Sequence, residues 1–435
     1  MQEKNNPKVI KAWAYFDWAN SAYSLVITST IFPVYYTAIT TTKEHGDKVF
    51  FFGKWFVNTA LTNYALSAGY LLMVFILPIL SSISDYRGNK KSFMKIFTYI
   101  GGFACIGLYF FTPKTLELGV ILFALAAVGW IGGALFYNSY LPEIASPDQQ
   151  DRVSAKGFAF GYLGSVVLQI ICFVFVFMPT TFGITDPSIP ARISFLLVGL
   201  WWIGFAQISF KHLPSGSINY NRLNKNAIHS GFQELHKVWL QVKQMRVLKL
   251  FLLAFFFYSM GIQTIMLVSA NFGEKILHLG APKLIITILL IQLLAIAGAF
   301  LMSYLVKIIG NFKVLTYSVI IWILLCLGAY FTTNEYQFYG LACIVGLVMG
   351  GIQSVSRSTF SKLLPDNTPD TASFFSFYDV TEKLAIVIGL FSFAYIEELT
   401  GNMRNSAVSL ITFFTIGLGY LIYIQCQKTE MTVNN

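Results

Sequence analysis

Five ionisable side chains lie within long apolar segments of this 435-residue sequence: Asp17, Arg357, Asp379, Glu382 and Lys383. Charges are costly in an apolar environment, so residues of this kind usually bind ions, relay protons or recognise charged ligands. Asp379 and Lys383 are four residues apart, which would place them on one helix face where they can form an ion pair. Arg357 lies near the end of its segment, so its long side chain could reach an aqueous surface.

Asp17 is the acid for which the sequence most favours a functional role, because Asn20 follows it about one helical turn later. The five charges are three acids and two bases, so one acid can lack a cationic partner. A buried carboxylate without a partner tends to take up a proton. This supports the hypothesis of coupling to protons. For Asp379 and Lys383, a structural ion pair between helices is an equally good interpretation.

Uncharged polar residues in the apolar segments could also line a path for a solute. With Asn20, the candidates are Tyr23, Asn138, Gln169, Gln263, Gln292 and Gln353. Polar side chains also join helices without touching a solute, so each of them could instead be structural. Arg357 and Lys383 could bind a carboxylate, and Asp17 could bind an ammonium group. An amino acid or another zwitterion would suit this set of charges.

The composition places these residues in a membrane. The chain is 56% hydrophobic and only 11% charged, whereas soluble domains carry roughly 25% charged residues. Twelve segments have the length of about 20 apolar residues that a spanning helix needs. They are 12–41, 60–83, 93–112, 117–141, 155–180, 191–211, 248–272, 282–306, 314–333, 336–361, 373–397 and 404–426. Only helices or closed barrels satisfy backbone groups in lipid, and these segments are too continuous for barrel strands.

The distribution of basic residues predicts the orientation of these helices. Most of the 30 Lys and Arg residues fall in segments on the same side of the membrane as the N-terminus. Loops rich in Lys and Arg remain in the cytoplasm, so we expect both termini to be cytoplasmic. The polar first eleven residues and the run after them lack a cleavage site, which indicates a retained first helix.

The longest polar stretch divides the predicted helices into two sets of six. The expected organisation is a first bundle over 1–211, a linker over 212–247 and a second bundle over 248–435. The second part of the linker has helical spacing of apolar and basic residues: Phe232, Leu235, Lys237, Trp239, Val242 and Lys243. This spacing predicts an amphipathic helix on the inner leaflet. A helix that binds a partner protein is the alternative.

The two halves also carry similar loops. The loop after the second span reads Asp85-Tyr86-Arg87-Gly88-Asn89-Lys90-Lys91. The loop after the eighth reads Lys307-Ile-Ile-Gly310-Asn311-Phe-Lys313. Parallel repeats of six helices are typical of one large architecture of transporters.

The first of these loops resembles the signature loop of the Major Facilitator Superfamily. Three further motifs resemble the bacterial Unknown Major Facilitator family, whose relatives are the yeast autophagy-linked vacuolar amino-acid effluxers. They are Ala-Trp-Ala-Tyr-Phe-Asp-Trp-Ala-Asn-Ser-Ala-Tyr from Ala12, Gly-Gly-Ile-Gln-Ser-Val-Ser-Arg-Ser from Gly350, and Phe-Phe-Ser-Phe-Tyr-Asp-Val-Thr-Glu-Lys from Phe374. The resemblance covers about residues 10 to 425.

The resemblance implies an all-α membrane protein of twelve helices in two bundles, which alternates access around a central cavity. It implies a secondary transporter in the bacterial inner membrane, with amino acids as substrates by analogy with the vacuolar relatives. The chain departs from the family at Met260, before Gly261, where relatives often carry an acid. A coupling role for that seventh span is therefore not expected.

A gating function is expected for the signature loop. The Asp85 carboxylate could lie at the N-terminus of the eleventh helix, where the helix dipole favours an anion. Arg87, Lys90 and Lys91 could hold the loop at the inner leaflet, with Gly88 at its turn. Such contacts would lock an outward-facing state. The alternative is that the basic residues serve only the orientation of the chain.

Other classes of function receive little support. The basic residues form no continuous stripe or tail, so nucleic-acid binding is not expected. The sequence contains no Walker loop, catalytic triad or metal-ligand set, so we expect no cofactor. We also expect the protein to be a monomer. All five His residues fall in predicted loops, and the five Cys residues form no C-x-x-C pair. The remaining alternatives are a lipid-handling protein of the same fold and an integral membrane enzyme that modifies lipid.

Overall fold

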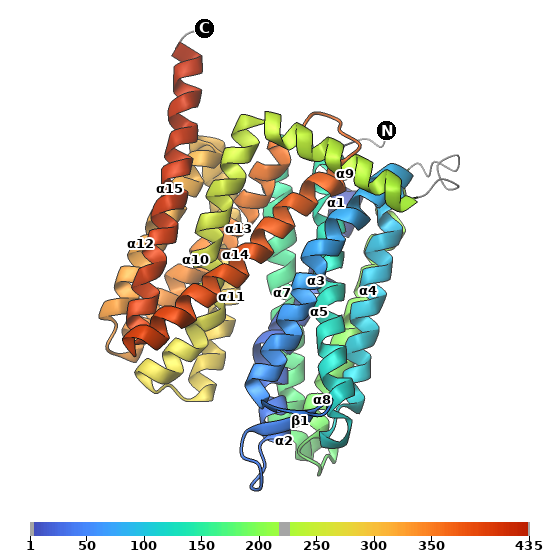
Figure 1. The fold of residues 1–435 in the computed structure, drawn as a ribbon, viewed down its shortest axis with the longest axis vertical. Coiled ribbons are helices and arrows are strands. Elements are labelled where there is room, and N and C mark those ends of the chain that lie inside the picture. Colours follow the sequence, from blue (N-terminus) through green and yellow to red (C-terminus); the bar gives the residue numbers. More distant parts are fainter. Residues whose placement is uncertain (1–3, 217–226, 434–435) are drawn as a thin grey trace. The chain divides into compact units, whose positions relative to one another are not determined.

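The structure, a computed structural model, describes residues 4–216 and 227–433 (Figure 1). All twelve predicted spans are helical, which confirms the all-α prediction. The first span consists of α1 (Pro7–Ala22), the π-helix η1 (Tyr23–Ile31) and α2 (Phe32–Thr40). The others are α3 (Asn58–Arg87), α4 (Lys90–Gly107), α5 (Leu116–Asn138), α7 (Gln150–Phe177), α8 (Ile189–His212), α10 (Arg246–Leu277), α11 (Ala281–Ile309), α12 (Asn311–Phe331), α13 (Glu335–Leu363), α14 (Thr371–Thr400) and α15 (Met403–Val433).

Eleven helical segments in the described ranges are long and apolar enough to cross a membrane. The twelfth, α14, has 30 residues, so its length is sufficient. Its charges Asp379, Glu382 and Lys383 lower its hydropathy, and this explains why composition alone does not select it. The helix that differs most from an ordinary span is therefore the one with three of the five charged candidate residues.

Several short elements connect the spans. They are the hairpin strands β1 (Lys48–Phe51) and β2 (Lys54–Val57), the 3-10 helices η2 (Leu108–Phe110), η3 (Pro113–Thr115) and η4 (Pro179–Phe182), and the helices α6 (Leu141–Ile144) and α9 (Ala227–Gln244). The hairpin was not predicted. Its turn residues Phe52 and Gly53 both have positive φ, at 42° and 83°, as a tight two-residue turn requires.

The chain folds as two compact units, each of which is described by itself. The C-terminal unit comprises Met1–Asn6, Asn138–Ala159 and Asn226–Asn435, and the N-terminal unit comprises Pro7–Tyr137 and Phe160–Lys225. Residues 138–159 come from the first half of the chain but belong to the unit of the second half. The predicted limits of two bundles and a linker over 212–247 remain a prediction, and residues 217–226 of that linker lie outside the described residues.

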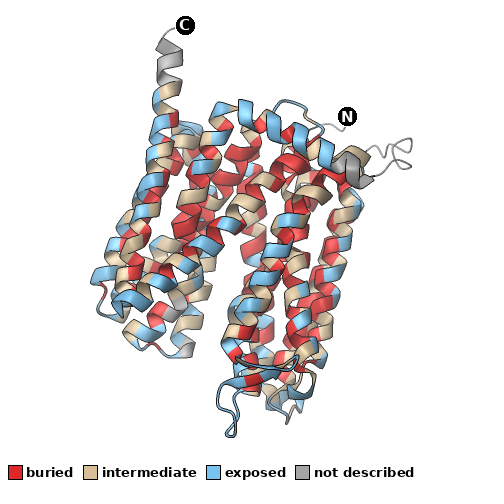
Figure 2. Cartoon of the chain, viewed as in Figure 1, coloured by how far each residue is buried: buried red, intermediate tan, exposed pale blue. Residues whose placement is uncertain are grey.

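The C-terminal unit is held together by close approaches of α11 and α13. A Cβ atom on Gly350 would lie 2.1 Å from the Ala295 carbonyl oxygen, and one on Gly346 would lie 2.7 Å from the Ile291 carbonyl oxygen. Glycines four residues apart let two helix backbones pack closely where lipid provides no hydrophobic force. Figure 2 shows the resulting pattern, with buried residues on the inner faces of the helices and exposed residues on the outer ones.

The linker helix α9 packs on the C-terminal unit. Val238 and Val242 are buried, and the Trp239 ring stacks on Phe377 with ring centroids 5.7 Å apart. The Lys237 ammonium lies 3.0 Å from the Asp370 carboxylate, just before α14. Burial raises the pKa of the Asp370 carboxyl, and the bond from Lys237 opposes this rise. The apolar residues predicted for this amphipathic helix thus differ in burial. Val242 is buried against the unit, whereas Phe232 and Trp239 are exposed.

In the N-terminal unit, α1 packs tightly against α7. A Cβ atom on Gly164 would lie 2.5 Å from the Trp18 carbonyl oxygen. Gly164 therefore permits this close packing. On the neighbouring side of α1, the Trp13 indole Nε1 donates to the Tyr137 carbonyl at 2.9 Å. These contacts fix the helix that carries Asp17.

Replacing Gly164 with leucine is therefore expected to lower the stability of the protein by about 2 kcal/mol through overpacking. The measurement is thermal unfolding of the protein in detergent. Gly204→Leu on α8 is the matched control, because a Cβ there would have no neighbour within 4 Å. Equal unfolding temperatures for the two variants would contradict the role of Gly164 in packing.

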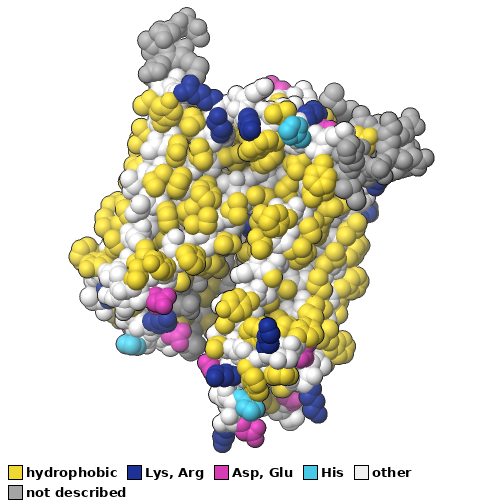
Figure 3. Space-filling model, viewed as in Figure 1, with side chains coloured by type: hydrophobic (Ala, Val, Ile, Leu, Met, Phe, Trp, Pro, Cys, Tyr) yellow, Lys and Arg dark blue, Asp and Glu magenta, His cyan; other side chains and the backbone are white. Residues whose placement is uncertain are grey.

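Large apolar side chains cover the visible surface of the helices (Figure 3). Phe75 on α3 and Phe391 on α14 are two exposed apolar side chains, at 66% and 71% exposure. Charged side chains gather toward the helix ends (Figure 3). A surface of this kind suits lipid around the middle of the helices and water at their ends.

Candidate functional site

Arg357 on α13 is buried in the C-terminal unit, with an exposure of only 3%. Its Nε donates to the Ser154 Oγ at 3.0 Å, and its Nη2 donates to the Ser154 carbonyl at 2.8 Å. Its Nη1 donates to the Asn138 Oδ1 at 3.1 Å. The guanidinium also lies over the Phe158 ring, 4.1 Å from the centroid. The expectation that Arg357 extends to an aqueous surface is wrong, because these partners hold it inside the unit.

The charged residues of α14 continue this cluster. Asn138 is also within hydrogen-bonding reach of the Asp379 carboxylate. One turn further, the Lys383 ammonium lies 2.6 Å from the Glu382 carboxylate. Asp379 and Lys383 are both buried, at 5% and 6% exposure. With Arg357 the cluster holds two cations and two acids close together.

Residues of α10 complete the cluster. The Gln263 Nε2 donates to the Glu382 Oε1 at 3.0 Å, and the Gln353 Nε2 lies 3.6 Å from the Met266 sulfur. The structure thus brings together most of the predicted residues of the C-terminal unit: Asn138, Gln263, Arg357, Asp379, Glu382 and Lys383. Gln292 on α11 does not join them through any bond of the described residues, and its buried Oε1 has no partner there.

A second polar cluster, centred on Asp151 at the start of α7, was not predicted. The Asp151 carboxylate accepts from the Ser358 Oγ at 2.7 Å and the Asn311 Nδ2 at 2.8 Å. It also forms an ion pair with Lys362. The only sequence signal was the repeated loop around Gly310 and Asn311. Both clusters bind residues 138–159 to α13, which explains why this segment belongs to the C-terminal unit.

Changing Asp151 to asparagine is expected to lower the stability by about 2 kcal/mol, because charge-assisted hydrogen bonds to Ser358, Asn311 and Lys362 are lost. Thermal unfolding measures this, and hydrogen exchange of residues 150–159 should accelerate with it. Asp148→Asn is the control, since Asp148 is exposed in the turn just before α7. A loss of the same size in the control would remove the special role of Asp151.

In the N-terminal unit, Asp17 on α1 is buried, with an exposure of 9%. Its carboxylate accepts from the Ser21 Oγ at 2.8 Å and from the Tyr137 hydroxyl at 3.2 Å. A Cβ atom on Gly161 of α7 would lie 3.2 Å from the Asp17 Oδ1. Asp17 is therefore enclosed by α1, α5 and α7, and two hydroxyl groups donate to its carboxylate.

The π-helix η1 follows this carboxylate directly. Thr30 Oγ1 lies 2.8 Å from the Leu25 carbonyl, five residues earlier, and 2.7 Å from the Gln169 Oε1 on α7. Tyr23, the first residue of η1, packs against the rings of Trp130 and Trp202. π-Helical segments are rare and are frequently found at functional sites. No pattern in the sequence indicated this element.

Two predicted residues of this unit keep a polar atom without a partner. Within the described residues, the buried Asn20 Oδ1 and Gln169 Nε2 form no hydrogen bond. An unsatisfied buried polar atom is costly, so such positions favour a bound water or solute. Asp17, Asn20, Tyr23 and Gln169 thus lie along one helical span and its neighbour α7.

The predicted gating loop has a defined geometry at the end of α3. Gly88 has φ of 67° and ends the helix, with its N–H directed at the Asp85 carbonyl at 3.2 Å. The Lys91 ammonium donates to the Leu213 carbonyl at 2.8 Å. Lys90 is buried, at 8% exposure, and Arg87 is the last residue of α3. Only glycine adopts this backbone conformation without strain.

No group of three or more His, Cys, Asp or Glu side chains in the described ranges could hold a metal ion. Charged and amide side chains on membrane-spanning helices are instead the main polar groups of both units. The long apolar helices that carry them define a multi-pass membrane protein, and the comparisons with known proteins agree with this class.

The described fold is that of Major Facilitator Superfamily transporters. The structure matches the crystal structure of the transporter FucP in the outward conformation with a TM-score of 0.71, over 97% of this chain and 99% of that chain, at 14% identity. It matches the human organic anion transporter MFSD10 with a TM-score of 0.70, over 96% of this chain and 100% of that chain, at 10% identity. These likenesses concern the fold alone.

Sequence comparison identifies the family. The model of the vacuole effluxer Atg22-like family matches residues 5–433. The chain is 30% identical to the uncharacterized MFS-type transporter YxiO of Bacillus subtilis, over 97% of this chain and 96% of that protein. It is 25% identical to autophagy-related protein 22 of Yarrowia lipolytica, over 87% of this chain and 77% of that protein. The chain belongs to the Atg22-like family and is a secondary transporter rather than an enzyme.

Proposed function

We propose that the protein transports amino acids or similar zwitterions by alternating access, as an effluxer driven by protons. The observation that carries this proposal is the buried cluster around Arg357, Asp379, Glu382 and Lys383. The name of the family, vacuole effluxer, supports a function in solute transport. A cluster with charges of both signs suits a solute that carries both a carboxylate and an ammonium group.

Within the cluster, we assign the carboxylate of the solute to Arg357 and Lys383. A guanidinium offers a planar pair of donors that matches a carboxylate. We assign the ammonium group to Asp379 or Glu382. Gln263 and Gln353 then contribute hydrogen bonds from α10 and α13. The existing bonds between these residues would be exchanged for bonds to the solute, so no charge is left unpaired in either state.

Asp17 is the proposed proton carrier. A carboxylate that is 9% exposed and accepts bonds from Ser21 and Tyr137 changes these bonds when it gains a proton. Asn20, Tyr23 and Gln169 are proposed to lie on the same path. The structural neighbours include FucP, described as a fucose:proton symporter, and this likeness in fold supports the proposal.

The distribution of Lys and Arg supports a bacterial plasma membrane protein with both termini in the cytoplasm. In this orientation α9 lies at the inner leaflet. Its exposed Phe232, Trp239 and Leu240 with Lys243 suit the boundary between lipid headgroups and water. We propose that the protein acts as a monomer.

The loop from Asp85 to Lys91 is the proposed gate. Asp85 lies in the last turn of α3, where the dipole of its own helix disfavours an anion. This unfavourable position supports a role in which the carboxylate stabilises one conformation through contacts outside its own helix.

Asp85→Asn is expected to slow transport about fivefold. The variant would lose the proposed interaction of the carboxylate with a helix dipole outside α3, which is worth about 1 kcal/mol. The affinity for the solute and the choice of solute should stay unchanged. Initial rates and equilibrium binding in proteoliposomes separate the two effects, with Glu117→Gln as a control at the other end of the unit. Unchanged turnover would argue against gating.

Uptake by proteoliposomes from a panel of labelled amino acids, sugars and carboxylic acids tests the proposed function. At least one amino acid should accumulate faster than in protein-free liposomes when a pH gradient is imposed. Transport of a sugar or a dicarboxylate with none of the amino acids would overturn the assignment of the substrate class.

A lipid-handling function remains a second candidate, favoured by one apolar cavity in the C-terminal unit. The same proteoliposomes can be prepared with a labelled phospholipid. Movement of this lipid between leaflets, without uptake of any soluble compound of the panel, would identify this function.

A further inference from the structure

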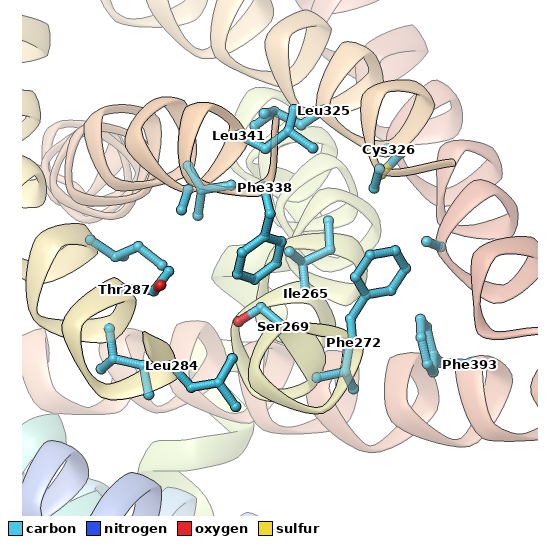
Figure 4. Close-up of a pocket in the computed structure, with 17 residues that line it drawn as sticks. Ile265, Ser269, Phe272, Leu284, Thr287, Leu325, Cys326, Phe338, Leu341 and Phe393 are labelled. Atoms are coloured by element: carbon cyan, nitrogen blue, oxygen red, sulfur yellow. The ribbon is translucent and has the colours of Figure 1, made fainter. Parts of the chain in front are cut away.

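An apolar cavity of about 80 Å³ lies among α10–α15 of the C-terminal unit (Figure 4). All six helices line it, and Phe338, Ile265 and Phe272 lie beside one another at its wall (Figure 4). The Thr287 hydroxyl, which also lines it, donates to the Lys283 carbonyl of its own helix at 2.8 Å. The cavity therefore offers apolar contacts and little to a polar group. Apolar cavities of this kind stay dry and bind apolar ligands.

The cavity is separate from the charged cluster. Along α13 it is lined as far as Val345, which precedes Arg357 by twelve residues, or about 18 Å of helix. Along α14 it is lined by Phe393, which follows Lys383 by ten residues, or about 15 Å. A ligand in the cavity would therefore not touch the proposed zwitterion site, and its function goes beyond the proposed transport.

One cation lies a helical turn away from a lining residue of the cavity. Arg404, in the first turn of α15, donates to the Tyr330 carbonyl at 2.5 Å. Tyr330 follows Ala329, and Ala407 follows Arg404 by about one turn; both alanines line the cavity. This bond holds the guanidinium at the backbone of Tyr330, one residue from the lining residue Ala329.

Lys275, Lys283 and Arg404 lie near the ends of α10, α11 and α15. Of these three cations, Arg404 is the one that has no acidic partner in the described part of the chain. Lys275 lies 3.2 Å from the Glu397 carboxylate, and Lys283 forms an ion pair with Glu335. Among the described residues, no ion pair joins Arg404 to the exposed Glu274 or Glu398. A guanidinium without a counterion next to an apolar cavity is complementary to an acidic head on an apolar chain.

We propose that this cavity binds an anionic amphiphile, with its alkyl chain among α10–α15 and its acidic head on Arg404. Fatty acids and anionic phospholipids share this chemistry. The ligand would bind as a stable part of the C-terminal unit rather than as cargo.

Binding of radiolabelled decanoate to the protein in phosphatidylcholine nanodiscs tests the proposal. Ala342→Phe should fill the cavity and weaken binding of decanoate and decanol at least tenfold. Gly340→Phe on the same helix is the control, because a Cβ there meets nothing within 4 Å. Equal affinity of wild type and Ala342→Phe would overturn the site.

Variants of Arg404 test the head group. Arg404→Gln should weaken decanoate about tenfold and leave decanol unchanged, whereas Arg404→Lys should retain most of the affinity. Equal effects of Arg404→Gln on both compounds would overturn the role of the guanidinium. Displacement of decanoate when phosphatidylglycerol replaces phosphatidylcholine would identify a phospholipid as the ligand, and no displacement would identify a free acid.

A diazirine analogue of decanoate gives a readout on the wild-type protein, in case Ala342→Phe does not fold. Cross-links are expected within 338–345 of α13 and at the start of α15. Cross-links confined to other helices would overturn the proposal. Transport of amino acids enters none of these measurements, so their outcome is independent of the proposed function.

Discussion

Replacing Arg357 with lysine is expected to reduce transport about 100-fold while the charge is conserved. An ammonium group cannot keep the bonds to the Ser154 Oγ, the Ser154 carbonyl and the Asn138 Oδ1 together with the contact to the Phe158 ring. Losing two charge-assisted bonds costs about 3 kcal/mol in total, which corresponds to about a 100-fold change. The measurement is the initial rate of solute uptake by proteoliposomes.

Arg246→Lys is the matched control for this prediction. Arg246 donates a hydrogen bond to the Tyr423 hydroxyl on the exposed surface, so its replacement should leave the rate within twofold of wild type. Equilibrium binding of the solute should be measured for Arg357→Lys as well. A variant that folds, binds the solute and transports it at the wild-type rate would refute the assignment of Arg357 to the site.

Asp17→Asn is expected to abolish accumulation of the solute driven by a pH gradient. One proton coupled to a gradient of one pH unit supplies about 1.4 kcal/mol, or roughly tenfold accumulation. The amide cannot carry that proton, but it can still bond to Ser21 and Tyr137. Exchange of labelled for unlabelled solute in the absence of a gradient should therefore persist.

Accumulation ratios with and without the gradient measure the effect of Asp17→Asn. Asp186→Asn, in an exposed loop of the same unit, should behave as wild type. Proton coupling through this carboxylate is excluded if the Asp17 variant accumulates solute as the wild type does.

The spans and the charged residues could be predicted because both depend on local sequence. A continuous apolar run of spanning length has few alternatives to a helix, and a charge such as Asp379 within such a run is conspicuous. Burial of Asp17 and Lys383 followed from the same signal. Whether these residues form the site stays a prediction.

Contacts between distant segments could not be predicted. The partners of Arg357 are Ser154 and Asn138, which lie 203 and 219 positions away in the sequence. Ordinary polar residues near the ends of spans carry no signal for such pairing, and for this reason the surface position predicted for Arg357 was wrong. The Asp151 cluster was missed for the same reason, since only tertiary packing brings Asn311 and Lys362 to it.

The nine residues of η1 have a mechanical consequence for the first span. In η1 each backbone N–H bonds to the carbonyl five residues earlier. A change to α-helical bonds, which reach four residues back, would rotate α2 relative to α1. Each backbone group would keep a hydrogen-bond partner, as lipid requires. Pro33 lies in the first turn of α2, where its missing N–H costs least. The first span thus consists of two α-helices, α1 and α2, joined by a π-helical segment that permits their relative rotation. This segment begins six residues after Asp17.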